Sequence, residues 1–275
     1  LSFGLQSAND RELKLLGRIH TWAEFLESFH LARECGFTNI NIDLMSALPG
    51  QTRESWKDTL KRVTDLNPEH ISAYSLIIED GTPFGEKYGS EEGRKLLPDE
   101  DSEREMYHET KRFLRDCGYE RYEISNYAKP GKECRHNIGY WTEVAYLGLG
   151  LGASSYMEGC RFTNEKDLDK YLALDFGEED PEKRETALRK LWGQIEELSQ
   201  AQRMEEFMFL GLRMLKGVSD VDFVRLFGVK METVYGDVIR RLTANGLLKK
   251  EENNLALTEW GMDVSNFVLS EFLLG

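Results

Sequence analysis

The residues best suited to chemistry lie in the stretch RHNIGYW, residues 135–141, where His136 and Asn137 precede the aromatic pair Tyr140 and Trp141. An imidazole can ligate iron or carry a proton near neutral pH, so His136 is a candidate for either role. The two aromatic rings can form the flat apolar walls that suit a planar ligand. The residues alone leave a second interpretation open, in which His136 is hydrogen-bonded in a turn or core and the rings pack around it.

A carboxylate, Asp43, is the sharpest candidate in the first half of the chain. It follows the alternating Ile40 and Ile42 and precedes LMSALPGQT, in which Pro-Gly predicts a turn and Thr52 predicts the cap of the next helix. A carboxylate at a strand end can accept hydrogen bonds from a ribose or an amine. It can equally serve to cap the strand, and the residues alone do not choose between these roles.

Further candidates follow from where strands end. In parallel α/β folds, functional side chains gather at the carboxyl edge of the strands. At the predicted strand ends these are Gln6, Ile77, Ile78, residues 123–126 and residues 148–155. Arg18, after Gly17, stands where a helix turns into the next segment, so its planar guanidinium can pair with a ligand carboxylate or remain a surface charge.

The run YLGLGLGASSY contains Gly148, Gly150 and Gly152. Their spacing differs from the G-x-G-x-x-G loop that binds dinucleotides, and the intervening leucines alternate as in a strand. The run therefore predicts a strand whose missing side chains let a neighbouring helix or a cofactor approach its backbone.

The elements that must position these residues are indicated by a pattern that occurs twice, in HLARECGFTNINIDL and FLRDCGYERYEIS. Each passes from an amphipathic helix through a glycine, Gly36 or Gly118, into a strand, as at the joint of an α/β unit. We expect strands near 2–6, 38–44, 70–77, 119–125 and 145–155, and helices near 21–35, 52–66, 100–116 and 165–174. This alternation predicts a parallel sheet with right-handed crossovers. A closed (β/α) barrel needs about eight such units. With only five expected strands, the chain can form only part of such a barrel.

From Leu198 onward the pattern changes to three helices followed by a short strand and turn, which predicts a winged-helix-like α+β domain. Before it, DFGEEDPEKRET is acidic and contains a proline, as linkers often do. We therefore expect a partial barrel over 1–175, a linker over 176–197 and a C-terminal domain over 198–275.

Composition restricts the class of partner. The 275 residues include 49 acidic and 35 basic side chains, a formal charge of −14 that repels phosphate backbones. We therefore expect no nucleic acid as partner, despite the winged-helix pattern with Arg240 and Arg241. No run of about 18 apolar residues and no secretory leader is present, so we expect a cytoplasmic protein without a transmembrane segment.

The cysteines Cys35, Cys117, Cys134 and Cys160 are irregularly spaced and include no C-x-x-C pair. We interpret them as four free thiols and expect neither a zinc site nor an iron–sulfur cluster from them. The chain begins at Leu1, inside a strand-like segment, so we expect it to be part of a longer protein.

Seven strings, in order, make a family resemblance specific: LSFGLQSANDRELKLLGRIH, GFTNINIDLMSALPGQT, NPEHISAYSLIIEDGTPF, GYERYEISNYAKPG, CRHNIGYW, YLGLGLGASSY and EEFMFLGLRMLKGV. Together they resemble the oxygen-independent coproporphyrinogen III oxidase-like radical SAM proteins, and most of all their HemW-type haem chaperone branch. The resemblance implies a partial (β/α) TIM-like barrel that binds S-adenosylmethionine, followed by a winged-helix-like domain. It also implies a [4Fe-4S] cluster on a C-x3-C-x2-C motif, which this sequence lacks. We therefore expect the cluster only in the full-length parent, and this chain to be inactive alone.

The resemblance carries roles to particular residues. Gln6, Arg18, Asp43, Ile77 and Ser154 match family positions that contact S-adenosylmethionine. Ser154 departs from the family, because the chaperone branch commonly has histidine there. The H-N-x-x-Y-W motif, which is associated with haem binding, is complete as His136, Asn137, Tyr140 and Trp141, and makes His136 the candidate ligand of the haem iron.

The resemblance favours one function over two others. The oxidases carry GMDHFA after GY, where this chain has YEISNYA. We therefore expect a haem chaperone that delivers haem to haem-accepting proteins, as a monomer or a homodimer. The alternatives are a coproporphyrinogen III oxidase, which decarboxylates its substrate to protoporphyrinogen IX, and a winged-helix regulator that binds nucleic acid.

Overall fold

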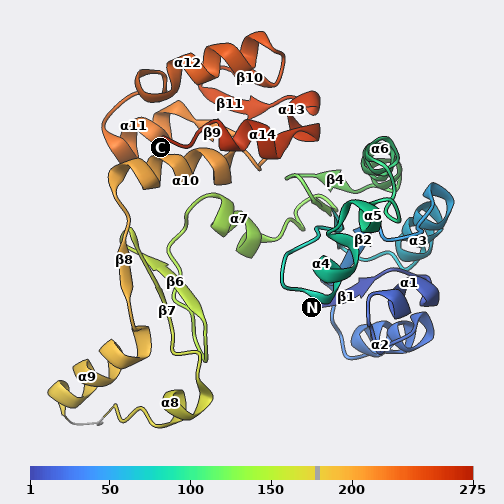
Figure 1. Cartoon of the computed structure of the whole chain (residues 1–275), viewed down its shortest axis with the longest axis horizontal. Coiled ribbons are helices and arrows are strands. Elements are labelled where there is room, and N and C mark those ends of the chain that lie inside the picture. Colours follow the sequence, from blue (N-terminus) through green and yellow to red (C-terminus); the bar gives the residue numbers. More distant parts are fainter. Residues whose placement is uncertain (177–179, 275) are drawn as a thin grey trace. The chain divides into compact units, whose positions relative to one another are not determined.

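The structure is a computed structural model that describes residues 1–176 and 180–274 (Figure 1). It consists of two compact units, Leu1–Cys134 and Arg135–Gly275. Each unit is described by itself below.

The first unit is built on a five-stranded sheet in the order β1-β2-β3-β5-β4. Strands β1 (Ser2–Gln6), β2 (Asn41–Ser46) and β3 (His70–Ser75) are parallel, as the alternation of strands and helices predicts. Strand β5 (Asn126–Ala128) runs antiparallel to β3 and pairs with the two-residue β4 (Glu120–Arg121). The fourth predicted strand, 119–125, therefore does not continue the parallel sheet, because the chain turns back after Arg121 and reaches β3 from the opposite direction.

Six helices connect these strands: α1 (Asp10–Leu15), α2 (Trp22–Glu34), α3 (Arg53–Asp65), α4 (Pro83–Tyr88), α5 (Glu91–Arg94) and α6 (Glu100–Asp116). The side chains of Thr21, Thr52 and Asp99 cap α2, α3 and α6 by accepting hydrogen bonds from backbone amides of the first turn. Just past the ends of α2 and α6, Gly36 and Gly118 adopt the left-handed conformation, with φ of 88° and 86°.

The sheet has one apolar and one polar face. Successive side chains of a strand point to opposite faces, and Leu5, Ile42, Leu44 and Ile71 belong to the buried core together with side chains of α2, α3 and α6. In this core Trp56 donates its indole hydrogen to Thr110 across 2.8 Å, so even the largest buried ring has its polar atom satisfied. The opposite face carries the polar side chains of the three parallel strands and is available for a site.

The second unit begins with α7 (Arg135–Trp141) and continues into an antiparallel sheet of β6 (Ser154–Met157), β7 (Cys160–Thr163) and β8 (Ile195–Glu197). Helices α8 (Leu168–Leu172) and α9 (Pro181–Trp192) lie between β7 and β8 in the chain. The segment expected to be a linker thus contains α9 and β8, and β8 pairs with β7. Residues 177–179 of that segment lie outside the described residues. Residues 135–175, which we expected to belong to the barrel, cluster with the C-terminal residues.

The C-terminal part contains α10 (Gln200–Gly211), α11 (Asp220–Phe227) and α12 (Met231–Ala244), then the hairpin β10 (Leu248–Glu251) and β11 (Asn254–Leu257). Strand β9 (Val218–Ser219) pairs with β11, and α13 (Glu259–Asp263) and α14 (Ser265–Ser270) follow the hairpin. Three helices and a hairpin are the order expected for a winged-helix-like domain. Its interior is aromatic, with the rings of Phe223 and Tyr235 6.2 Å apart.

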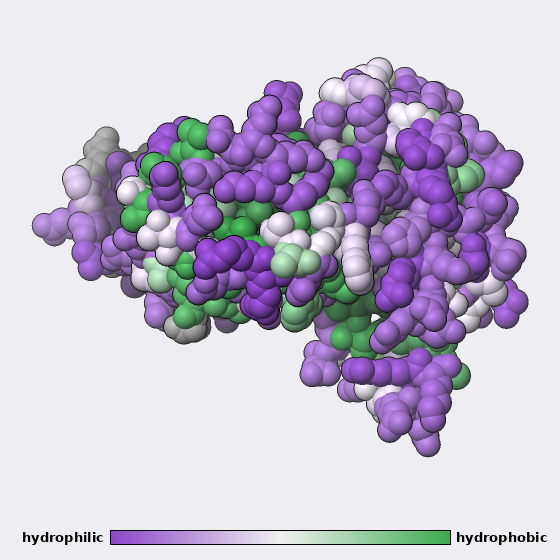
Figure 2. All heavy atoms as spheres, turned by 90° about the horizontal axis from the view of Figure 1, so that it is seen from above, coloured by the Kyte–Doolittle hydropathy of each residue, from purple (hydrophilic) through white to green (hydrophobic). Residues whose placement is uncertain are grey.

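The strand predicted over 145–155 is wrong. Only the end of this stretch enters β6, and Gly150 and Gly152 adopt positive φ angles of 101° and 65°, which strands do not use. Leu149, just before Gly150, is 84% exposed, so the alternation of leucine and glycine does not reflect burial. The molecular surface is largely hydrophilic with hydrophobic side chains in places, as expected for a highly charged chain (Figure 2).

Candidate functional site

The polar face of the first sheet holds the carboxylate of Asp43 in a fixed position. Its Oδ1 accepts a hydrogen bond of 2.8 Å from Nδ2 of Asn41, and its Oδ2 accepts one of 3.1 Å from Oγ of Ser2. Each carboxylate oxygen keeps a second lone pair for another donor. Asp43 is therefore oriented by its neighbours while it can still accept hydrogen bonds from a ligand.

Gln6 and Arg18 lie together beside Gly4. A Cβ atom at Gly4 would stand 3.2 Å from Nε2 of Gln6 and 3.9 Å from a terminal nitrogen of Arg18. The hydroxyl of Tyr74, on β3, donates to Oε1 of Gln6 across 3.2 Å. Burial raises the pKa of Tyr74, and the negative charge of Asp43 raises it further. Gln6, Arg18 and Asp43 are thus parts of one local environment.

Arg18 is available to bind an anion. Its side chain is exposed, and within residues 1–176 and 180–274 it forms no ion pair. Its backbone amide closes the end of α1 by donating to the carbonyl of Leu13 across 3.0 Å. The helix end thereby fixes where the guanidinium starts, and the free planar fork suits a carboxylate.

Two other predicted residues, Ile77 and Ser154, have surroundings of their own. Ile77 follows β3 and is 75% exposed. Ser154 belongs to the second unit, where its hydroxyl lies 3.2 Å from that of Thr163 across the β6–β7 pair. The residues that the first unit brings together are therefore Gln6, Arg18 and Asp43.

The RHNIGYW stretch forms helix α7, which places His136 and Tyr140 one turn apart on the same face. Both side chains are exposed, and their rings meet edge to face with centroids 4.8 Å apart. The ring of Tyr146 lies 4.8 Å from that of Tyr140, also edge to face. His136 is consequently an exposed imidazole beside Tyr140, and the interpretation of it as a core residue is wrong.

Trp141 and Asn137 face a different environment. Asn137 is half-buried, and Trp141 is half-buried beneath the guanidinium of Arg213, whose Cζ lies 4.4 Å from the ring centroid. Two residues further on, Glu143 is largely buried, and burial together with the charge of Glu206 raises its pKa to about 7. The C-terminal end of α7 is thus an anchor, and its first turn carries the exposed histidine.

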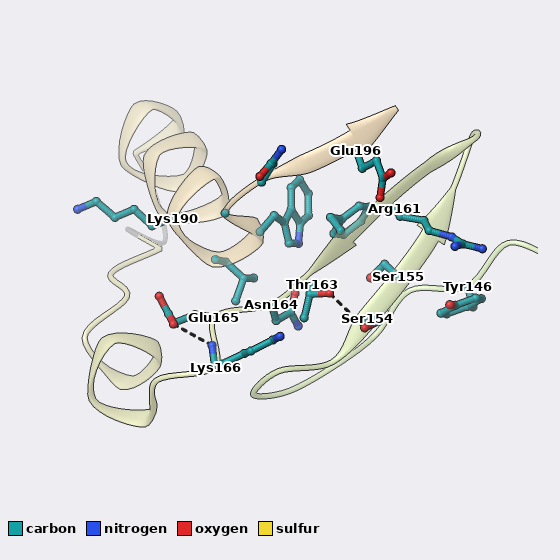
Figure 3. A pocket seen from close by; sticks show the side chains of 15 residues that line it. Tyr146, Ser154, Ser155, Arg161, Thr163, Asn164, Glu165, Lys166, Lys190 and Glu196 are labelled. Atoms are coloured by element: carbon teal, nitrogen blue, oxygen red, sulfur yellow. Dashed lines mark hydrogen bonds between the residues drawn. The ribbon is translucent and has the colours of Figure 1, made fainter. Parts of the chain in front are cut away.

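A cavity of about 990 Å³ opens along the β6–β8 sheet and α9 (Figure 3). Its walls include Tyr146, Ser154, Thr163, Asn164 and Trp192. The amide of Asn164 donates to the carbonyls of Gly148 and Gly150, at 3.2 and 2.8 Å, and so fixes the glycine-rich loop at its rim. Through Tyr146, the wall of this cavity continues into the aromatic contacts of Tyr140 and His136.

Sequence reasoning missed a buried carboxylate next to the polar face. Glu12 is 7% exposed and accepts hydrogen bonds from Ser7 (2.6 Å), Gln51 (2.9 Å) and Ser55 (2.9 Å). These contacts tie the loop after β1 to the loop after β2, so they fix the two strand ends that carry Gln6 and Asp43. The polar residues in QSANDRE and PGQTRES were the available signal, but their pairing depends on the fold.

Two family models match the sequence. The Radical SAM superfamily matches residues 1–63, and the HemN C-terminal domain matches residues 198–264. A solved structure, the coproporphyrinogen III oxidase HemN from Escherichia coli, superimposes with a TM-score of 0.75 at 22% identity, over 100% of this chain and 64% of that one. This likeness confirms the expected fold class, an α/β chain with a partial TIM-like barrel of the radical SAM type and a smaller C-terminal domain.

Sequence relatives narrow the class further. The chain is 37% identical over 274 residues to heme chaperone HemW of Lactococcus lactis, covering 100% of this chain and 69% of that protein. It is also 37% identical over 273 residues to heme chaperone HemW of Bacillus subtilis, covering 99% and 69%. The chain belongs to the HemW family of radical SAM proteins. Within the described residues, no helix is both long and apolar enough to cross a membrane.

Proposed function

We propose that this chain is part of a haem chaperone that binds haem at the exposed face of α7 and S-adenosylmethionine at the polar face of the first sheet. The proposal that the chain binds haem rests on the exposed imidazole of His136, which lies edge to face with Tyr140. A histidine kept in solvent on a short helix contributes little to packing, so its presence there fits an intermolecular ligand better than a core role.

The residues of α7 fit a haem group. Within the described part of the chain, no hydrogen bond fixes either ring nitrogen of His136, which leaves both available. Tyr140 and Tyr146 offer aromatic surface beside it. Trp141 anchors the C-terminal end of this helix, because its ring is covered by Arg213. His136 would bind the haem iron, and Tyr140 and Asn137 would contact the haem group.

The residues of the polar sheet face fit S-adenosylmethionine. Arg18 suits its carboxylate, Asp43 suits its amine or ribose hydroxyls, and Gln6 offers an amide beside them. We assign Ile77 and Ser154 as two further contacts on the strength of the family pattern alone. With its cluster, this cofactor supplies one-electron chemistry in radical SAM proteins.

The chain does not provide a cluster site. Cys35, Cys117, Cys134 and Cys160 are unpaired thiols in four separate places, and no group of three or more metal-binding side chains occurs among the described residues. No cluster role is therefore proposed for them.

We prefer a chaperone function to an oxidase function for this chain. The curated relatives at 37% identity are named heme chaperones, whereas the likeness to coproporphyrinogen III oxidase at 22% identity concerns the fold. We propose haem-accepting proteins as partners, which receive haem from the exposed face of α7.

Transfer distinguishes a chaperone from a protein that merely adsorbs haem. Haem-loaded chain is mixed with a haem-requiring protein in its apo form, and the absorbance change is followed at increasing acceptor concentration. The proposal expects a rate that rises with acceptor concentration, because direct transfer requires an encounter. A rate independent of acceptor concentration would indicate simple dissociation and contradict it.

Isothermal titration calorimetry with S-adenosylmethionine tests the proposed cofactor site on the first sheet. Arg18→Ala is expected to weaken binding about tenfold, because a charge-assisted pair is lost. Arg11→Ala serves as the matched control, since Arg11 is an exposed arginine on the same helix.

A further inference from the structure

A chain of hydrogen bonds crosses the polar face of the first sheet, from Asp43 on β2 to the backbone of Cys134. It passes through Asn41, His70 and Tyr122, each within 3.3 Å of the next. Cys134 is the residue immediately before α7. These hydrogen bonds therefore connect a proposed cofactor contact with the last residue of the first unit.

The orientation of Asn41 follows from its neighbours. On one side lie the Asp43 carboxylate at 2.8 Å and Ser2 Oγ at 2.8 Å, and Ser2 itself donates to Asp43. A carboxylate only accepts, so the Asn41 group facing it is the NH₂. The Oδ1 atom of Asn41 then faces His70 at 2.7 Å and Ser72 at 3.2 Å, and it must accept from both.

This orientation determines the tautomer of His70. Because Oδ1 of Asn41 only accepts, Nδ1 of His70 carries the hydrogen. The ring is 3% exposed, and burial lowers its pKa to about 4, so it is neutral at pH 7 and Nε2 has a lone pair. Nε2 accepts from the hydroxyl of Tyr122 at 2.8 Å, and that hydroxyl accepts from the amide of Cys134 at 3.3 Å.

All four links consequently donate in one direction. The Cys134 amide donates to Tyr122, Tyr122 to His70, His70 to Asn41, and Asn41 to Asp43. Hydrogen bonds aligned in this way polarise one another. The series ends on the carboxylate of Asp43, which is its one negatively charged member. The arrangement holds the Asp43 carboxylate more firmly than a contact with Asn41 alone.

We propose that His70, held as its Nδ1–H tautomer, is a positioning residue that fixes Asp43 and couples it to the backbone at Cys134. The proposal rests on the proposed function, because it takes Asp43 as a cofactor contact. Coupling of this kind is reciprocal: a ligand that strengthens the Asp43 end orders Cys134, and an ordered Cys134 favours the ligand. The backbone at Cys134, the last residue of the first unit, is thus sensitive to what binds at Asp43.

The test uses the 275-residue chain without any cofactor. Nitrogen-15 NMR reports which ring nitrogen of His70 is protonated, and amide hydrogen exchange reports the Cys134 amide. Wild type is expected to show the Nδ1–H form. Tyr122→Phe removes the hydroxyl that links Cys134 to His70, and is expected to speed exchange at Cys134 about fivefold, as for loss of one hydrogen bond. Asp43→Asn, at the far end, is expected to speed it about twofold.

The matched control is Tyr119→Phe, which removes a buried hydroxyl that donates to the Pro68 carbonyl at 2.7 Å, outside the chain of hydrogen bonds. It is expected to leave the Cys134 amide and the His70 tautomer unchanged. An Nε2–H tautomer in wild type, or an unchanged Cys134 amide in both Tyr122→Phe and Asp43→Asn, would overturn the proposal.

A titration with S-adenosylmethionine separates this proposal from the proposed function. If wild type binds it, Tyr122→Phe is expected to weaken binding about threefold while Tyr119→Phe does not, as for a contact that acts through another residue. Equal affinities of wild type and Tyr122→Phe would contradict the coupling. If wild type does not bind, the proposed cofactor site fails, and the tautomer and exchange results still decide the positioning role of His70.

Discussion

The guanidinium of Arg213 covers the ring of Trp141, with its Cζ 4.4 Å from the ring centroid. Trp141 is the last residue of α7, and Arg213 follows the end of α10. The contact fixes the C-terminal end of α7, so that the helix can present His136 and Tyr140 to solvent without unravelling. A helix of seven residues needs such tertiary support, because isolated helices of this length are unstable in water.

Replacing Arg213 by glutamine is expected to destabilise the second unit by about 1 to 2 kcal/mol, the range of a partly desolvated cation–π contact. Urea unfolding followed by tryptophan fluorescence measures this change. Arg225→Gln is the control, since Arg225 forms an exposed pair with Asp222 and is expected to cost less than about 0.5 kcal/mol. Equal losses in the two variants would show that the Trp141 contact does not support α7.

Gly4→Ala is expected to weaken S-adenosylmethionine binding about fivefold, as for one displaced hydrogen bond. The added Cβ would stand 3.2 Å from Nε2 of Gln6, so the amide must move away from its present position. Gly4 is exposed and its φ is not positive, so the unfolding midpoint is expected to stay unchanged. Unaltered affinity, measured by calorimetry, would show that Gln6 does not contact the ligand.

The two units are expected to respond to pH in opposite directions. Burial lowers the pKa of His70 from 6.5 to about 4, so the unfolded chain binds more protons between these values. The first unit therefore loses stability as pH falls from 6.5 to 4, by about 3 kcal/mol. Burial raises the pKa of Glu143 from 4.5 to about 7, so the folded chain binds more protons and the second unit loses stability as pH rises through that window.

Hydrogen exchange resolves the two units, because amides of β2 report on the first and amides of α10 on the second. Glu143→Gln is expected to flatten the pH dependence of the α10 amides and to leave that of the β2 amides unaltered. The same pH trend in both units would contradict the assignment of these two groups.

Much of the first unit could be predicted because its signals are local. The glycines after α2 and α6, the capping side chains of Thr52 and Asp99, and the alternation around Ile42 each specify their own element. The direction of β5 could not be predicted, because pairing with β3 depends on how the chain returns after Arg121. The glycine-rich loop misled for a physical reason: its leucines alternate but remain exposed.

Some residues of the candidate site could be predicted from the sequence, and others could not. Gln6, Arg18 and Asp43 could be proposed from strand ends and family motifs, and in the structure all three act on the hydroxyl of Tyr74. His70 and Tyr122 could not be recognised, because they lie 52 positions apart and look like an ordinary strand residue and an ordinary aromatic until the sheet aligns them. Long-range polar partners of this kind are visible only in the fold.

The central claim is that His136 binds the haem iron, and a haem titration of two matched variants tests it most directly. His30, like His136, is an exposed helical histidine edge to face with an aromatic ring, here Phe29 at 5.9 Å and 80°. His136→Ala is expected to shift the Soret band and weaken haem binding about tenfold or more, because the imidazole that would bind the iron is lost. His30→Ala is expected to match wild type. An unchanged Soret band and affinity in His136→Ala would contradict the account.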